Sequence, residues 1–487
     1  MQKENLTYHG TFEVDGHSFW GQLSLAGSRT QLVMRTEERL IKSDLPATIH
    51  GRSHDFKLVS CIQCVGGKFP IEAWGQDGRT STSWNIQPHQ ILIGNKHFNP
   101  VTDRIRKAWF STPDIYHLFD DMDSYGIVFR PSPEQVSVIP KTIGNRQVPH
   151  GPRPILTYFA GRTELLNAQL AFGKFSVVSS AGPNSSSRGV KIDAKIWIQL
   201  EFNEPAELEL CLGRIRAIAQ FLSIIAGRSQ GVEGLHVEKN DADEKPLPID
   251  VYWVLGPRQS EEEQHEPSWH DIPLDGIRWP DEFTRVIEKW FDSDDLKPAR
   301  ARLYSCLDAG SHFTPDRLVA AANLFDLSIG TATEEISREL AQAKQECLRI
   351  LKAVPCSDDR DGAIQALHRI GSLTLLKKVL TRANILRGHF QMGDLDKILK
   401  QAILFRNYFV HGPSDTRFKY EVVEPHRIFL TETLEFVFAA AELIECGWEG
   451  RSWHLRPHTG DHWFTRYLSD YDEASRSLLA ALDNAKK

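Results

Sequence analysis

The sequence predicts an α+β protein with a β-rich N-terminal part, of the antiparallel sandwich or barrel type, followed by an all-α bundle. Three observations predict this order. Short alternating runs with turn signals every ten or so residues fill the first hundred positions. Over residues 192–202, apolar and polar side chains alternate with a period of two. After about residue 280 the apolar residues recur at helical spacing instead.

The first hundred residues contain the runs that predict an antiparallel sheet. Residues 21–25 and 57–62 alternate in polarity, and pairs such as Asp-Gly, Ala-Gly and Gly-Gly separate the runs. Residues 104–109 and 113–119 are expected to be short helical pieces. A single CxxC, Cys61 to Cys64, has no second pair near it, so we interpret both residues as thiols of the core.

The middle of the chain predicts one strand and one helix in succession. In residues 192–202 every second side chain is apolar, which indicates one buried face. Residues 208–225 then carry apolar side chains at helical spacing, and Ala226-Gly227 ends the helix. A further strand is expected at 251–255. The acidic segment after residue 260 is interpreted as a linker or an exposed loop, which predicts domains at 1–265 and 280–487.

The C-terminal part predicts a bundle, because several runs of helical periodicity follow one another with short breaks. Expected helices cover residues 281–291, 314–329, 333–352, 364–370, 373–386, 395–410 and 429–446.

Composition excludes several classes of protein. The 487 residues are 41% hydrophobic and 25% charged, as in a globular protein of two or three domains. No run reaches the ~18 apolar residues of a membrane helix, and the N-terminus has no apolar signal core, so we expect a cytoplasmic protein without membrane contacts. The net charge of −7 argues against a general nucleic-acid coat protein, but it permits a local basic site.

The most informative motif is Arg406-Asn407-Tyr-Phe-Val-His411, at the end of the predicted helix 395–410. Residues five apart on a regular helix point about 140° away from each other. Arg406 and His411 would therefore diverge, unless Gly412-Pro413 lets the last turn loosen and brings His411 back.

A basic stretch leads into this motif. Between residues 364 and 411 eight Lys and Arg residues face only two Asp residues, which gives +6 in an otherwise acidic chain. The stretch is interpreted either as a solvated helix face or as a surface that binds the phosphates of RNA. The RNA-binding candidates are Lys377, Lys378, Arg382, Lys397 and Lys400.

The motif resembles the R-x(4–6)-H motif of HEPN-domain ribonucleases. With a β-rich first half before it, the whole chain is similar to the ApeA family of bacterial anti-phage proteins. The stretches that carry this resemblance, besides the motif, are residues 9–12 (HGTF), 21–25 (GQLSL), 49–51 (IHG), 93–98 (IGNKHF) and 289–291 (KWF).

The resemblance implies a C-terminal HEPN domain, an N-terminal sensor or regulatory domain that detects a phage-derived trigger, and an RNA-cleaving effector of abortive infection. Arg406, Asn407 and His411 would be the catalytic residues. HEPN ribonucleases bring two motifs into one cleft by dimerising, so a homodimer is expected. The RNA substrate supplies its own 2′-OH nucleophile, so neither metal nor other cofactor is expected. Transfer, messenger and ribosomal RNA all remain open as substrates.

Three alternatives compete with this interpretation. Arg406 could pair with a carboxylate while His411 caps the helix C-terminus, where cations are favoured. The HEPN domain could bind RNA or protein without catalysis. A metal hydrolase could be built on Cys446 and on three histidines spaced by four, although Pro457 and Gly460 interrupt a helix there; these histidines are His454, His458 and His462.

Overall fold

The computed structural model describes residues 6–37, 45–66, 71–74, 80–137, 142–143, 146–147, 151–239, 248–259, 266–329, 337–368, 370–371, 373–413 and 418–485. The chain forms two compact units that interleave along the sequence. The first comprises Met1–Ala219, Gln230–Arg258 and Asp275–Glu288, and the second comprises Gln220–Ser229, Gln259–Leu274 and Lys289–Lys487. The predicted domain limits at 265 and 280 stay a prediction.

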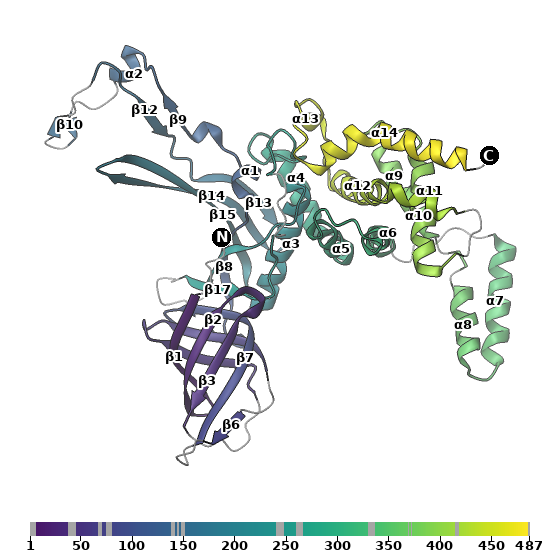
Figure 1. Cartoon of the computed structure of the whole chain (residues 1–487), viewed down its shortest axis with the longest axis horizontal. Helices are drawn as coiled ribbons and strands as arrows, with labels where there is room; N and C mark the ends of the chain where they lie inside the picture. Colours follow the sequence, from purple (N-terminus) through teal and green to yellow (C-terminus); the bar gives the residue numbers. More distant parts are fainter. Residues whose placement is uncertain are drawn as a thin grey trace. The chain divides into compact units, whose positions relative to one another are not determined.

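A closed antiparallel barrel of six strands begins the first unit (Figure 1). The ring closes because β1 pairs with both β2 and β4, while β7 pairs with both β3 and β5. The predicted sandwich-or-barrel fold is confirmed as a barrel. Its strands are β1 (Leu6–Val14), β2 (His17–Leu25), β3 (Gln31–Thr36), β4 (Thr48–Ser53), β5 (Leu58–Gly66) and β7 (Thr80–Gly94).

The barrel interior is filled by the alternate side chains of these strands. Phe12, Phe19, Ile49 and Trp84 belong to one buried apolar cluster. Cys61 lies in the same cluster, which agrees with its interpretation as a core thiol. The period of two therefore fixes which side chains of each strand face outward.

The sheet continues beyond the barrel through β17, which pairs with β7, and from there in the order β16, β8, β15, β14 and β13. The predicted helical piece at 104–109 is wrong. β8 occupies it, and its side chains Ile105, Ala108 and Phe110 are buried, the last two at the alternate spacing of a strand. The bounds are β8 (Ile105–Ser111), β13 (Glu164–Leu170), β14 (Gly173–Ser186), β15 (Gly189–Ala206), β16 (Glu233–Lys239) and β17 (Ile249–Trp253).

The predicted helix of the middle part is α3 (Leu208–Ala226), and it ends at Ala226 as the pair Ala226-Gly227 predicts. Several short elements complete this part of the chain. The short elements are β6 (Ile71–Trp74), α1 (Ile115–Leu118), β9 (Tyr125–Val128), α2 (Pro133–Ser137), β10 (Thr142–Ile143), β11 (Arg146–Gln147) and β12 (Leu156–Phe159).

The predicted helical bundle is confirmed, and α12 is its buried centre, packed against α6, α9, α10 and α14. Helices α5 and α14 were not predicted. Helix α7 begins at Arg338, because the Ser337 side chain caps it; residues 333–336 lie outside the described residues. The helices are α4 (Pro280–Asp292), α5 (Lys297–Asp308), α6 (Pro315–Ile329), α7 (Arg338–Ala353), α8 (Asp358–His368), α9 (Leu375–Leu386), α10 (Leu395–His411), α11 (Tyr420–Val423), α12 (Arg427–Glu445), α13 (Arg451–His454) and α14 (Trp463–Asn484).

Among the described residues, we find no helix that combines the length and the apolar composition needed to cross a membrane.

Candidate active site

The Arg406–His411 motif lies on the last turns of α10. The helix forms because apolar side chains recur on one face and are buried in the bundle, among them Ile398, Ala402 and Phe405. It continues through His411, and Gly412 ends it with φ of 75° while its N–H still bonds the Tyr408 carbonyl. The predicted loosening of the last turn is therefore wrong.

Arg406 nevertheless reaches His411, because its side chain is long enough to span the turn. The Nη1 atom of Arg406 lies 3.5 Å from Nε2 of His411. A guanidinium group can only donate hydrogen bonds, so Nε2 of His411 accepts in this contact. His411 is exposed, which leaves the ring accessible from outside the bundle.

Two amide groups hold the guanidinium of Arg406. Nη1 donates to Oδ1 of Asn407 at 3.2 Å, and Nη2 donates to Oδ1 of Asn323 at 3.1 Å. The Asn407 side chain therefore accepts a hydrogen bond from Arg406. Asn323 comes from α6, 83 positions earlier, and sequence reasoning missed it because no local spacing links the two helices.

Among the residues that the structure describes, Arg406 pairs with no carboxylate. The alternative in which Arg406 only supports the fold requires such a partner. Its two amide partners are neutral, so the positive charge of the guanidinium is oriented without being cancelled. The position of His411, at the end of α10, is the one expected of a capping cation as well as of a catalytic base.

Aromatic rings pack behind the motif and fix the end of α10. The ring centroids of Tyr408 and Tyr420 lie 5.0 Å apart, and those of Phe405 and Phe418 lie 5.7 Å apart. Offset pairs at such distances stabilise the packing. The turn that carries Arg406 and Asn407 is thus held by side chains from α10 itself and from the chain after it.

Two of the five predicted RNA-binding residues are buried. Lys378 is 7% exposed and lies 3.0 Å from Asp326, and Arg382 is 5% exposed and pairs with Glu442 and Glu445. Their charges are compensated inside the bundle, so they are not available to phosphates. We therefore remove Lys378 and Arg382 from the RNA-binding set.

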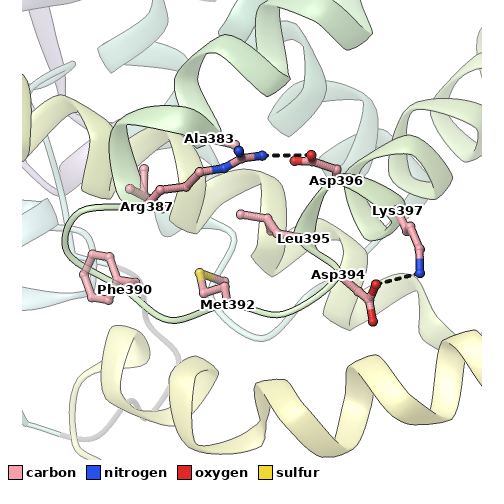
Figure 2. Close-up of a pocket in the computed structure, with 9 residues that line it drawn as sticks. Ala383, Arg387, Phe390, Met392, Asp394, Leu395, Asp396 and Lys397 are labelled. Atoms are coloured by element: carbon pink, nitrogen blue, oxygen red, sulfur yellow. Dashed lines mark hydrogen bonds and ion pairs between the residues drawn. The ribbon is translucent and has the colours of Figure 1, made fainter.

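The other three, Lys377, Lys397 and Lys400, are exposed. Lys397 lies 2.7 Å from Asp394 and lines a cavity of about 340 Å³ between α9 and α10, in which Arg387 and Asp396 also form an ion pair (Figure 2). This cavity is at the start of α10. Lys397, the lining residue nearest to Arg406 in sequence, precedes it by nine positions, so at 1.5 Å per residue the two are about 13 Å apart along the helix and are separate features.

The histidines of the proposed metal hydrolase have structural partners instead. His462 is buried as the N-cap of α14, where Nδ1 accepts from the Phe464 N–H and Nε2 donates to the Ile224 carbonyl. Burial lowers the pKa of His462 to about 3, so the ring is neutral, and burial raises the pKa of the Cys446 thiol to about 12. Among the described residues, no cluster of His, Cys, Asp and Glu has the geometry of a metal site.

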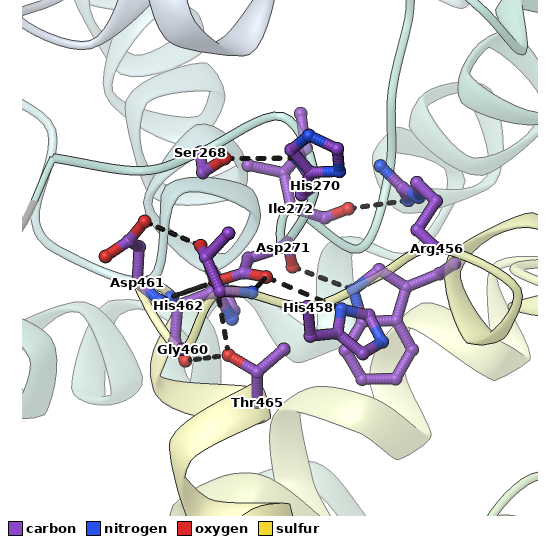
Figure 3. A network of polar contacts seen from close by, with 12 residues as sticks. Ser268, His270, Asp271, Ile272, Arg456, His458, Gly460, Asp461, His462 and Thr465 are labelled. Carbon is purple, nitrogen blue, oxygen red and sulfur yellow. Dashed lines mark hydrogen bonds and ion pairs between the residues drawn. The ribbon is translucent and has the colours of Figure 1, made fainter.

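A buried carboxylate organises the same segment. Asp271 accepts hydrogen bonds from the backbone of Thr459, Asp461 and His462, and His458 lies 3.5 Å from it (Figure 3). Burial by itself would raise the pKa of Asp271, but these hydrogen bonds outweigh it and the pKa is lowered. In place of a metal site, this segment therefore forms a hydrogen-bond network around Asp271, next to the N-cap of α14.

Two family models match parts of the chain. A family model described as ApeA N-terminal domain 1 matches residues 2–290, and one described as Apea-like HEPN matches residues 322–451, a span that contains Asn323, Arg406, Asn407 and His411. No curated protein and no solved structure matches the chain. The HEPN match suggests an anti-phage effector, from a domain family that generally consists of ribonucleases. The first model alone covers more than half of the sequence, and the chain therefore belongs to the ApeA family, with a HEPN domain in its C-terminal part.

Proposed function

We propose that this chain is a metal-independent endoribonuclease, which acts as an anti-phage effector of abortive infection by cleaving RNA, with transfer RNA one candidate substrate. The observation that carries the proposal is the contact of Arg406 with an exposed His411, while two neutral amides orient the guanidinium. A cation held in this way keeps its charge for a phosphate.

The proposed reaction needs two kinds of group. The 2′-OH of the RNA attacks the adjacent phosphorus, and its proton passes to an imidazole; free histidine titrates near ~6.5 and suits this task. The P–O5′ bond breaks and the leaving oxygen takes up a proton. The products are a 2′,3′-cyclic phosphate and a 5′-OH end. The planar guanidinium of Arg406 stabilises the negative charge on the phosphate oxygens.

One Arg406–His411 pair offers a single imidazole, whereas the reaction moves a proton both from the attacking oxygen and to the leaving one. A two-fold dimer would bring a second His411 to the same phosphate, and two-fold dimers are the commonest assembly of homo-oligomers. We therefore place the proposed cleavage at a composite site formed by two copies of the chain.

Replacing His411 tests catalysis. His411→Ala should lower RNA cleavage by about 10²–10⁴ because the proton-transfer group is lost, while thermal stability stays nearly unchanged because the ring is exposed. His368→Ala is the matched control, since His368 is the exposed last residue of α8. Cleavage should persist in EDTA. Loss of cleavage in EDTA, or equal cleavage by the His411 and His368 variants, would contradict the proposal.

The main alternative is a HEPN module that binds RNA or protein without cutting. The same variants separate the two, since catalysis predicts that His411→Ala keeps RNA affinity while it loses cleavage. An intact protein that binds RNA but never cuts it, with or without a phage infection, would favour the alternative.

A mixing experiment tests the composite site. A heterodimer of Arg406→Ala and His411→Ala chains, which are inactive alone, keeps one Arg406 and one His411 on opposite chains. If these two groups suffice, the mixture regains part of the activity and both motifs share one cleft; if both His411 imidazoles are needed, as base and as acid, the mixture stays inactive and the second measurement decides. Light scattering at the assay concentration provides the second measurement. A fully active monomer would rule out the composite site, while cleavage that requires the dimer would support it.

A further inference from the structure

A polar cavity of about 500 Å³ lies on the outer face of the β-barrel, away from the residues of the HEPN motif in sequence and in unit. Its size is within the range of small-molecule sites. The pairing of β1, β4 and β5 creates it. Phe12, Ile49 and Val59 of these strands are buried, so their neighbours in sequence face outward.

Two cross-strand rows form the floor of the cavity. In one row Glu13 of β1 lies opposite His50 of β4, and in the other Thr11 lies opposite Arg52. Leu58 of β5 continues the second row. A carboxylate, an imidazole, a hydroxyl and a guanidinium therefore share one hollow. This mixture of donors and acceptors would bind a ring that carries both.

Two neutral histidines, His50 and His97, also line the cavity. His97 lies against His50, with ring centroids 4.7 Å apart, and bonds the backbone of Val59. Its Nδ1 atom is covered and has no hydrogen-bond partner among the described residues. Burial lowers the pKa of His97 and, together with His97, that of His50, so both rings are neutral at pH 7.

The same cavity also presents a cation and an aromatic face. The guanidinium carbon of Arg52 lies 4.9 Å from the centre of the Phe56 ring, and Phe56 is 73% exposed. Phe56 also has φ of 65°, a conformation that bulky residues rarely adopt. An exposed aromatic ring held in a strained turn is typical of a binding position. It offers a face for stacking, next to a fork that suits a phosphate.

We propose that this cavity binds a free nucleoside monophosphate. The base would stack on Phe56 and direct its N–H groups to the Glu13 carboxylate, while the phosphate would bind Arg52. The cavity lies in the N-terminal unit, and the inference stands independently of RNA cleavage, because binding is the quantity measured.

Calorimetric titration of the full-length protein with AMP, GMP, CMP and UMP tests this proposal. At least one should bind with a Kd between about 1 μM and 1 mM, and the matching nucleoside and inorganic phosphate should each bind at least about tenfold more weakly, since each lacks half of the contacts. Failure of all four monophosphates to bind more tightly than phosphate would overturn the proposal.

Variants locate the bound ligand. Arg52→Gln and Phe56→Ala should each weaken binding about tenfold or more, whereas Arg29→Gln, an exposed arginine of the same unit that does not line the cavity, should not. Melting curves confirm that the variants are folded. Equal binding by all three variants would overturn the site, as would binding lost in Arg406→Ala but kept in Arg52→Gln. A tetranucleotide that binds here when no free monophosphate does would assign the cavity to strand ends and overturn the free ligand.

Discussion

Arginines in the helical unit have two kinds of surroundings, and the difference separates support of the fold from candidate chemistry. Arg300 and Arg317 are buried, each pairs with a glutamate of α12, and each lies over an aromatic ring. Arg406 is partly exposed and held by two amides. A carboxylate cancels the charge of an arginine, whereas an amide oxygen orients the guanidinium and leaves its charge for a ligand.

Glu442 of α12 is the shared partner of two buried arginines. Its carboxylate accepts from both Arg300 and Arg382, at distances between 2.6 and 3.1 Å, and it is 1% exposed. Removing one partner of a buried ion pair leaves an uncompensated charge, which typically costs 3–5 kcal/mol. Because two arginines share Glu442, both lose part of their compensation at once.

We therefore expect Glu442→Gln to lower the free energy of unfolding by about 3–5 kcal/mol. Arg406→Ala should lower it by only about 1 kcal/mol, since it removes hydrogen bonds to amides at a partly exposed site. Urea unfolding of both variants measures the two changes. If Arg406→Ala is as destabilising as Glu442→Gln, Arg406 belongs with the arginines that support the fold and the proposed function loses its main support.

Sequence periodicity predicted the fold because burial follows the chain locally. The alternation in β15 and the stripes of α3, α10 and α12 appear where the apolar residues predict them. Helix α5 was missed for a physical reason: Arg300, a charged residue that is usually exposed, is buried there against Glu442.

The candidate site was only partly predictable for the same reason. Lys378 and Arg382 have the charge of an RNA-binding face, but their carboxylate partners lie 52 and 60 positions away in sequence. Asn323 lies 83 positions from Arg406. Such pairings depend on which helices pack together, and local spacing contains no record of that.

Two histidines of the helical unit also differ in their surroundings, since His462 is buried whereas His411 is exposed. The pKa of His462 in the folded protein is about 3, below the ~6.5 of an unfolded histidine. Above pH 6.5 the ring is neutral in both states and its contribution to stability is complete. As the pH falls below 6.5, only the unfolded chain takes up the proton, so the free energy of unfolding decreases.

We expect His462 to account for a loss of about 2 kcal/mol between pH 6.5 and pH 5. His462→Asn keeps an acceptor at the N-cap of α14 but does not titrate, so this part of the pH dependence should disappear. Urea unfolding at several pH values measures it, with His411→Ala as the control that keeps the wild-type dependence. An unchanged dependence in His462→Asn would show that the buried ring does not control stability in this range.

The smallest expected effect concerns the lysines that stay exposed. If Lys377, Lys397 and Lys400 contact phosphates, their joint replacement by alanine should reduce the slope of the logarithm of RNA affinity against the logarithm of salt concentration. The slope should fall by up to about two, since each single-strand phosphate contact contributes about 0.7. Arg338, Arg349 and Lys352, all exposed on α7, provide a control with the same change in charge. The Asp394 carboxylate next to Lys397 should make the flattening fall short of that limit. A slope that is equal in both triple variants would make the basic stretch an ordinary solvated face, with Arg406 as the cation that remains for RNA.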